Sequence, residues 1–87
     1  MPVVWIPSLL QPLTDGQEKV PVPGETLRQV IENLEGRFPG IRNRLCEGDR
    51  LRPSMVAVVD GVVSRQGLRH RLEEGSEVHF LPAISGG

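Results

Sequence analysis

The chain has one cysteine (Cys46), one tryptophan (Trp5) and no tyrosine among its 87 residues. A single cysteine excludes an internal disulfide and every zinc site built from several thiolates, so a reducing cytoplasmic setting is expected. The sequence also lacks an apolar run long enough to cross a bilayer, and no stretch has the pattern of a signal peptide. We therefore expect a single small domain with no membrane partner.

Neither sign of charge is in strong excess, because 10 basic and 11 acidic residues give a formal net charge of -1. A domain that binds nucleic acid is usually clearly basic, so nucleic acid is not an expected partner. A loose basic run in the middle of the chain is interpreted as a solvated face or as a docking surface for an acidic partner. It consists of Arg37, Arg42, Arg44, Arg50 and Arg52.

Motifs for cofactors and metals are also missing. Gly48-Asp49-Arg50 fits no Walker-type phosphate loop, so no bound cofactor is expected and any ATP must be used by another protein. His70 and His79 have no acidic companions at metal-ligand spacing and are predicted to be surface residues, with no metal site. Cys46 has no evident activating partner and is interpreted as a small filler on a helical turn.

Alternation of apolar residues and the spacing of turn residues predict five short strands. In the first strand Val4 and Ile6 share one face and Trp5 lies on the other, while Pro7 and Pro12 predict an edge or an interruption. In the last strand Val78 and Phe80 share one face, and His79 and Leu81 share the other. The predicted strands are Pro2–Leu10, Glu18–Val22, Met55–Val59, Val62–Ser64 and Glu77–Leu81.

The clearest element is a helix from about Leu27 to about Arg37, with an apolar stripe at helical spacing. Thr26 precedes it and Gln29 follows three residues later, which is the pattern of a capping box. Pro39 disfavours continuation of the helix. The segment 40–46 predicts one further helical turn, and Glu47–Arg50 predicts a loop.

The order β-β-α-β-β-β predicts an α+β fold, in which one main helix packs across a mixed sheet of four to five strands. The first and last strands are expected to run parallel at the sheet centre. Residues 1–81 would form the domain, and residues 82–87 would form a flexible tail that ends in Gly86-Gly87. Glycine has no Cβ, so such a tail can enter a narrow channel of another protein; a frayed terminus is the alternative.

This element order, together with Gly67-Leu68, the step Glu74–Val78 and the tail from Leu81, resembles the ubiquitin-like β-grasp sulfur carriers. That family includes the small subunit of molybdopterin synthase, the thiamine-thiazole sulfur carrier and the carrier of a thiocarboxylate route to cysteine. The last of these is the most similar, because the molybdopterin subunit more often has an aromatic residue and two prolines where this chain has Leu81-Pro82-Ala83. Further matching positions are Ile6-Pro7, Leu10, Pro12, Thr14, Gly16-Gln17, Thr26-Leu27, Leu34-Glu35, Gly40-Ile41 and Arg44-Leu45.

The resemblance implies a carrier protein that is not itself an enzyme. An E1-like adenylating and sulfur-transferring enzyme would use ATP to activate the carboxylate of Gly87, which would then become a thiocarboxylate. A sulfur-accepting, cysteine-synthase-like enzyme would receive the sulfur, and a metalloprotease that processes the tail is a further implied partner. The implied tail and docking residues are Gly86, Ser85, Ile84, Pro82, Leu81 and Trp5.

Three other interpretations stay open. The chain fits a subunit that inserts its tail permanently into a catalytic partner, as in molybdopterin synthase, or a plain binding module with an accidental Gly-Gly end. It also fits a ubiquitin-like modifier that forms isopeptide bonds through Gly87. Lys19 is its only lysine, which leaves almost no acceptor for chain building on the protein itself.

Overall fold

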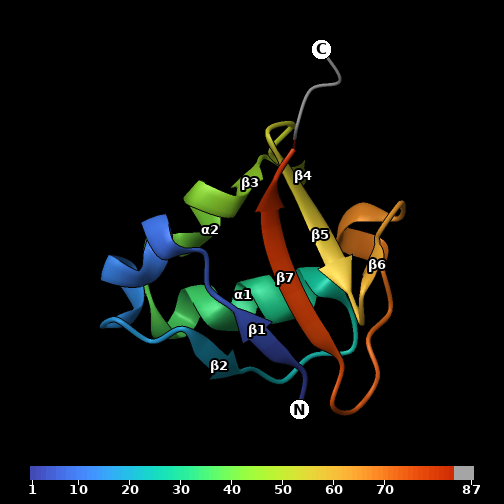
Figure 1. Ribbon diagram of the computed structural model, residues 1–87, viewed down its shortest axis with the longest axis horizontal. Coiled ribbons are helices and arrows are strands. Elements are labelled where there is room, and N and C mark those ends of the chain that lie inside the picture. Colours follow the sequence, from blue (N-terminus) through green and yellow to red (C-terminus); the bar gives the residue numbers. More distant parts are fainter. Residues whose placement is uncertain (84–87) are drawn as a thin grey trace.

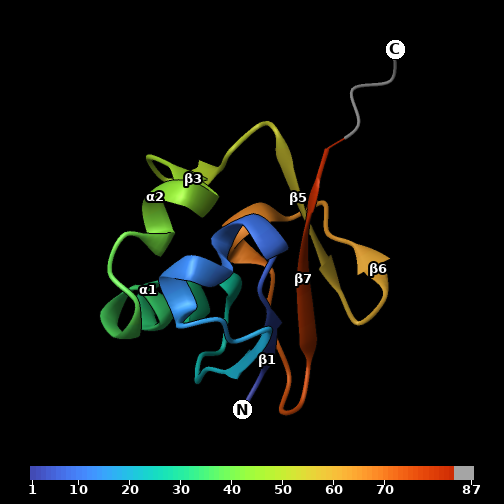
Figure 2. The ribbon, with the colours of Figure 1, turned by 60° about the vertical axis from the view of Figure 1, so that its left-hand side comes forward.

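A computed structural model describes residues 1–83, which form a five-stranded mixed sheet with all helices on one side of it (Figures 1 and 2). The strand order across the sheet is β2-β1-β7-β5-β6. The strands are β1 (Val3–Trp5), β2 (Lys19–Pro21), β5 (Met55–Val59), β6 (Val62–Val63) and β7 (Glu77–Pro82). The predicted class, one main helix across a mixed sheet, is confirmed.

The central strand of the sheet is β7, the last in the sequence. It runs parallel to β1, with Trp5 opposite His79, and antiparallel to β5, with Val56 opposite Leu81. All other neighbouring strands are antiparallel. The predicted parallel pairing of the first and last strands is therefore confirmed, and β7 has a hydrogen-bonded neighbour on each side.

The predicted first strand, Pro2–Leu10, is wrong beyond Trp5, because the chain turns into a 3₁₀ helix, η1 (Ser8–Thr14). Pro7 has no N–H for the sheet ladder, and its carbonyl instead accepts the N–H of Leu10 at 2.8 Å. Leu10 is thereby turned inward and buried. The Thr14 hydroxyl is hydrogen-bonded to the carbonyl oxygens of Gln11 and Gln17, which closes the end of η1.

The main helix, α1 (Leu27–Arg37), has the predicted bounds. The Thr26 hydroxyl accepts the N–H of Gln29 at 3.2 Å, as the capping box requires. The Gln29 side chain in turn accepts the N–H of Glu25, one residue before the expected donor. The apolar stripe Leu27, Val30, Ile31 and Leu34 is fully buried against the sheet.

A short helix, α2 (Ile41–Leu45), follows α1 as predicted and buries both of its end residues. The carboxylate of Glu35 caps it by accepting the N–H groups of Gly40 and Arg42 at 3.0 and 2.8 Å. The hydrogen bond from Gly40, followed by that from Arg42, holds the pKa of Glu35 below its ordinary value. The start of α2 is thus tied to the end of α1.

The segment after α2 was predicted as a loop at Glu47–Arg50, which is wrong in part. Two short strands, β3 (Cys46–Glu47) and β4 (Arg50–Leu51), form a separate two-stranded sheet around a tight turn. Side-chain bonds hold it: Arg42 donates to the carbonyl of Gly48, and Arg52 donates to the carbonyl of Asn43. The elements are completed by a second 3₁₀ helix, η2 (Gly67–Arg69), which buries Leu68.

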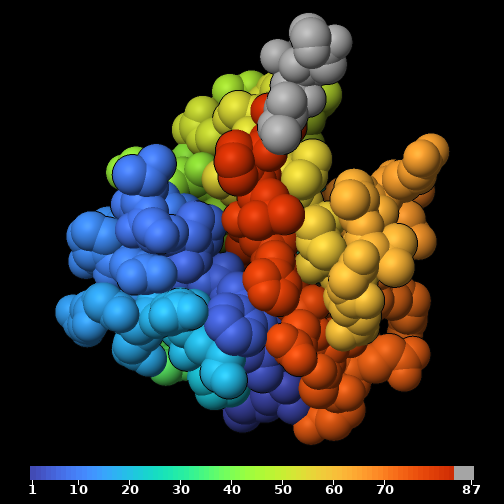
Figure 3. Space-filling view, in the orientation of Figure 1, coloured from blue at the N-terminus to red at the C-terminus, as the bar shows by residue number. Residues whose placement is uncertain are grey.

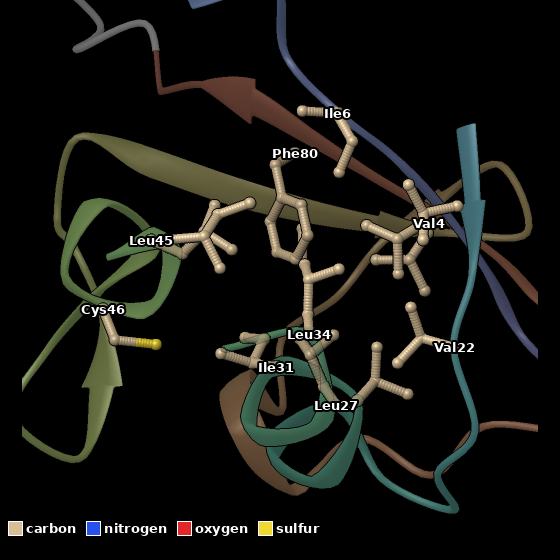
Figure 4. Packing of buried hydrophobic residues seen from close by; sticks show 14 of the residues in the cluster. Val4, Ile6, Val22, Leu27, Ile31, Leu34, Leu45, Cys46 and Phe80 are labelled. Carbon is tan, nitrogen blue, oxygen red and sulfur yellow. The ribbon is translucent and has the colours of Figure 1, made fainter. Parts of the chain in front are cut away.

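The hydrophobic core lies between the sheet and the helices (Figure 4). Val4, Ile6, Val78 and Phe80 enter it from the sheet, as alternation predicted. The buried stripe of α1 enters it from the other side. No helix within residues 1–83 has the length and apolar character that a membrane crossing requires.

Candidate functional site at the end of the last strand

The site begins where β7 leaves the sheet, at the end opposite the N-terminus (Figure 1). Pro82 is still paired with Met55, so the strand runs one residue past its predicted end at Leu81. The N–H of Ala83 then donates to the carbonyl of Ser54 at 2.8 Å. The backbone is therefore held up to Ala83. Ile84, Ser85, Gly86 and Gly87 lie outside the described residues, and their predicted roles stay predictions.

The face of the sheet that points away from α1 carries one row of side chains across all five strands. The register pairs Lys19 with Trp5, Trp5 with His79, His79 with Val58, and Val58 with Val63. Directly neighbouring side chains on one face of a sheet contact each other. Figure 3 shows the molecule from the side of this face, with the red strand β7 running along its middle.

Trp5 is half-buried in this row, and three neighbours fix its ring. The ring stacks on His79 with centroids 5.0 Å apart and an interplanar angle of 11°. The ammonium of Lys19 lies 5.2 Å from the ring centroid, and the indole N–H donates to a carboxylate oxygen of Glu77 at 2.9 Å. The predicted placement of Trp5 on the face opposite the helix is confirmed, and its orientation is set by contacts that the sequence did not reveal.

The same face has an apolar patch toward the end of β7. Leu81 is 47% exposed and lies opposite the half-buried Val56. We define the outer patch as Trp5, Val56, Val58, Val63 and Leu81. Trp5 and Leu81 were predicted from the sequence, whereas the three valines were missed. The alternation in Met55–Val59 implies that Val56 and Val58 face away from the buried Ala57 and Val59.

Beside β7 the surface is hollowed between that strand and η1, where red meets blue in Figure 3. This hollow has a volume of about 280 Å³ and is lined by Trp5–Ser8, Gln11, Glu18 and His79–Leu81. It was not predicted, because residues far apart in the sequence form it. It adjoins the outer patch, since Trp5 and Leu81 belong to both.

Cys46 and His70, which the sequence raised as candidate reactive or metal-binding residues, have structural roles instead. Cys46 is buried beside α1 (Figure 4), and burial raises its pKa despite the nearby Arg42, Arg28 and Arg52. The thiol is thus poorly activated as a nucleophile, which fits its interpretation as a filler. Nδ1 of His70 is hydrogen-bonded to the Ser64 hydroxyl at 2.7 Å. Residues 1–83 contain no group of three His, Cys, Asp or Glu side chains placed to hold a metal ion.

The structure has a mixed sheet wrapped around one long helix. Its central strand is the last in the sequence and leads to the C-terminal end of the chain. This arrangement defines a ubiquitin-like β-grasp protein. Solved structures agree with this class. The chain superimposes on Mycobacterium tuberculosis CysO with a TM-score of 0.89 and 34% identity, covering 97% of this chain and 100% of that one. It also matches one chain of the Amycolatopsis orientalis BexX/CysO complex with a TM-score of 0.92 and 30% identity. This match covers 100% of this chain and 100% of that one.

The model of the ThiS family matches residues 4–87, and the chain belongs to that family. It is 38% identical to "Sulfur carrier protein CysO" of M. tuberculosis, over 97% of this chain and 96% of the relative. It is also 30% identical to "Small archaeal modifier protein 3" of Haloferax volcanii, over 71% of this chain and 70% of the relative. The resemblance to ubiquitin-like sulfur carriers, and the prediction of a carrier rather than an enzyme, are thereby confirmed.

Proposed function

We propose that this protein carries sulfur as a thiocarboxylate on Gly87 and donates it in the biosynthesis of cysteine. The observation on which the proposal rests is its 38% identity to a CysO sulfur carrier over nearly the full length of both chains. The match to a chain of the A. orientalis BexX/CysO complex, again over the whole chain, also supports it.

The chemistry requires activation, because a carboxylate is a poor electrophile whose leaving group would be oxide. An ATP-using, E1-like enzyme would transfer AMP to the Gly87 carboxylate and release pyrophosphate. Sulfide, or a persulfide from a donor, would then attack the carbonyl carbon and expel AMP. With a persulfide, a thiol would then reduce the S–S bond, which releases the thiocarboxylate and leaves the thiol joined to the donor as a disulfide. The resulting sulfur is a soft nucleophile, and no step needs an acid or base from the carrier.

The folded body would present the tail and bind the partner. The bond between Ala83 and Ser54 fixes where the tail starts, and the outer patch lies next to that point. Exposed apolar patches of this kind mark interaction surfaces. The A. orientalis structure similar to this chain is a complex of CysO with BexX, so a protein of this fold does assemble with a second protein.

Three partners complete the scheme: the E1-like activating enzyme, a cysteine-synthase-like enzyme that accepts the sulfur, and a metalloprotease that processes the tail. The acceptor would offer an activated serine derivative, whose carbon the thiocarboxylate sulfur attacks. An S-to-N acyl shift and hydrolysis after Gly87 would release cysteine and regenerate the carboxylate. ATP belongs to the activating partner in this scheme.

The proposal is tested by intact-mass spectrometry of the protein purified from its host, together with a variant that lacks Gly87. The wild type should show the mass gain of one oxygen-to-sulfur exchange, and the variant should lose it completely. The thermal midpoint of the variant should stay the same, because Gly87 follows the last residue that the sheet holds. A wild type that is never thiolated, even when incubated with its adenylating enzyme, ATP and a sulfur donor, would contradict the proposal.

A second function, protein modification through an isopeptide bond at Gly87, is favoured by the similarity to the archaeal modifier. It begins with the same adenylation and differs in the acceptor, a lysine amine instead of sulfide. High-mass adducts that an isopeptidase removes would support it. Their absence from a lysate that contains the thiocarboxylate form would leave sulfur carriage as the function.

A further inference from the structure

We propose that the hollow beside β7 receives an arginine side chain of the protein that takes the tail. The hollow is the surface lined by Trp5–Ser8, Gln11, Glu18 and His79–Leu81. This inference rests on the proposed function only in naming the partner as the tail-accepting protein. The recognition itself follows from the shape, charge and position of the hollow.

The charge of the hollow favours a cation. Glu18 is the only carboxylate residue among those lining the hollow, which include no lysine or arginine, and within residues 1–83 no ion pair or side-chain hydrogen bond involves its carboxylate. Nearby, Lys19 lies over the Trp5 ring and Glu77 accepts the indole N–H. These three charged residues leave one net negative charge beside the hollow.

The walls favour a cation on an apolar stem. Its lining residues include the aliphatic Ile6, Pro7 and Leu81, together with Trp5, whose ring is stacked on His79. Lysine and arginine both bury their methylene stems on such surface and keep the charged end at a polar group. An uncharged apolar side chain would cover Glu18 without pairing it, which costs free energy.

The polar groups favour arginine over lysine. The Gln11 amide nitrogen donates to the carbonyl of Ile6 at 3.1 Å, so its amide oxygen remains an acceptor. Ser8 and Glu18 also line the hollow, and their side chains carry a hydroxyl and a carboxylate that can accept hydrogen bonds. A guanidinium has five N–H donors in a planar fork and can serve several acceptors at once, whereas an ammonium is a compact point charge.

Size and position identify a protein side chain as the occupant. A volume of about 280 Å³ is at the lower limit of sites for whole small molecules, which span roughly 300–1,000 Å³. Leu81 lines the hollow and is two residues before Ala83, whose N–H is bound to Ser54. Any protein that encloses the tail next to its start therefore lies over the hollow.

Trp5 makes a direct test possible, because it is the only tryptophan and lines the hollow. Its fluorescence would be titrated with N-acetyl-arginine amide, N-acetyl-lysine amide and N-acetyl-leucine amide. The arginine amide should give a saturable change at the lowest concentration. Glu18→Gln should weaken its binding about threefold, the size expected for an exposed charge pair. Glu32→Gln, which removes an exposed carboxylate from α1 on the other side of the sheet, should leave it unchanged.

Equal responses to the leucine and arginine amides would overturn the proposal, and so would an unchanged affinity in Glu18→Gln. A second measurement uses the adenylating enzyme that thiolates the wild type. Charge reversal, Glu18→Arg, should raise KM at least tenfold with little change in kcat, because the contact aids docking and not chemistry. A variant with unaltered KM would also overturn the proposal. If no enzyme thiolates the wild type, the proposed function fails while the fluorescence titration still decides the role of the hollow.

Discussion

The two faces of the sheet use the same strands for different purposes. Val78 and Phe80 point from β7 toward α1 and are almost fully buried, while their neighbours His79 and Leu81 point outward. The inner face is uniformly apolar. The outer face mixes valines, a leucine, a stacked Trp–His pair and charged residues.

This contrast separates folding from recognition along a single strand. Burial of apolar area stabilises the fold roughly in proportion to the area, so side chains on the inner face contribute most of the stability. Side chains on the outer face remain partly in water and are free to contribute to binding. The period of two in a strand places both tasks on alternate residues of β7.

The difference between the faces is tested most directly by truncating two neighbouring residues of β7 that point to opposite faces of the sheet. Phe80→Ala removes a ring from the core and should lower the free energy of unfolding by about 3–5 kcal/mol. Leu81→Ala removes a side chain that is 47% exposed and should cost under about 1 kcal/mol. Urea denaturation followed by circular dichroism would measure both.

Phe80→Leu keeps most of the volume and should cost about 1.5 kcal/mol, which covers the case that Phe80→Ala fails to fold. Leu81→Ala should instead raise the KM of thiolation. Comparable losses of stability in Phe80→Ala and Leu81→Ala would contradict the division between the faces.

A second variant tests packing on the inner side, where Gly24 in the loop between β2 and α1 lies against the first turn of α1. Gly24 has φ +154°, and a Cβ placed there would lie 2.7 Å from Cγ2 and 2.8 Å from the backbone nitrogen of Val30. Gly24→Ala should therefore cost about 1–3 kcal/mol through overpacking at the start of the helix.

The matched control is Gly36→Ala in the last turn of α1, where a Cβ would meet nothing within 4 Å. This change should stabilise the protein by about 0.5–1 kcal/mol, because glycine is a poor helix former. Thermal melts of the two variants should shift in opposite directions. A stabilised Gly24→Ala would show that the helix can move away from the sheet without cost.

A third variant, with a smaller expected effect than Gly24→Ala, concerns the link between α1 and α2. Glu35→Gln should lower stability by about 1 kcal/mol at neutral pH, since it weakens a charged cap on the Gly40 and Arg42 N–H groups. The folded-state pKa of Glu35 is lowered from 4.5, so its carboxylate stabilises the fold above that pH and loses this effect as the pH falls through the folded pKa. The stability difference between wild type and variant should close in acid, and a difference that persists there would contradict the charged cap.

The inner face could be predicted from the sequence almost completely. It depends on local patterns in the sequence. The stripe of α1 and the alternation in β7 each follow one periodicity, and the Thr26–Gln29 cap follows a fixed spacing of three residues. The layer of one mixed sheet over one helix followed from the economy of burying the helix stripe, and the parallel pairing of the first and last strands was expected with it. The structure agrees with each of these.

The elements that were missed depend on contacts between distant residues. In η1, Pro7 and Pro12 signalled only an interruption, while the burial of Leu10 and Thr14 that shapes the helix involves the tertiary core. Strands β3 and β4 have two residues each, too few for an alternation pattern. The hollow needs β1, η1 and β7 together, so no local signal could have located it.

The bond between Ala83 and Ser54 sets a limit on distance. Gly87 is four residues further along the sequence, and an extended chain of that length spans at most about 14 Å. The reaction centre of any enzyme acting on the Gly87 carbonyl must come within that radius of the sheet. Such an enzyme must have its catalytic centre close to its surface. Otherwise the mouth of its active site must be wide enough to admit the end of β7.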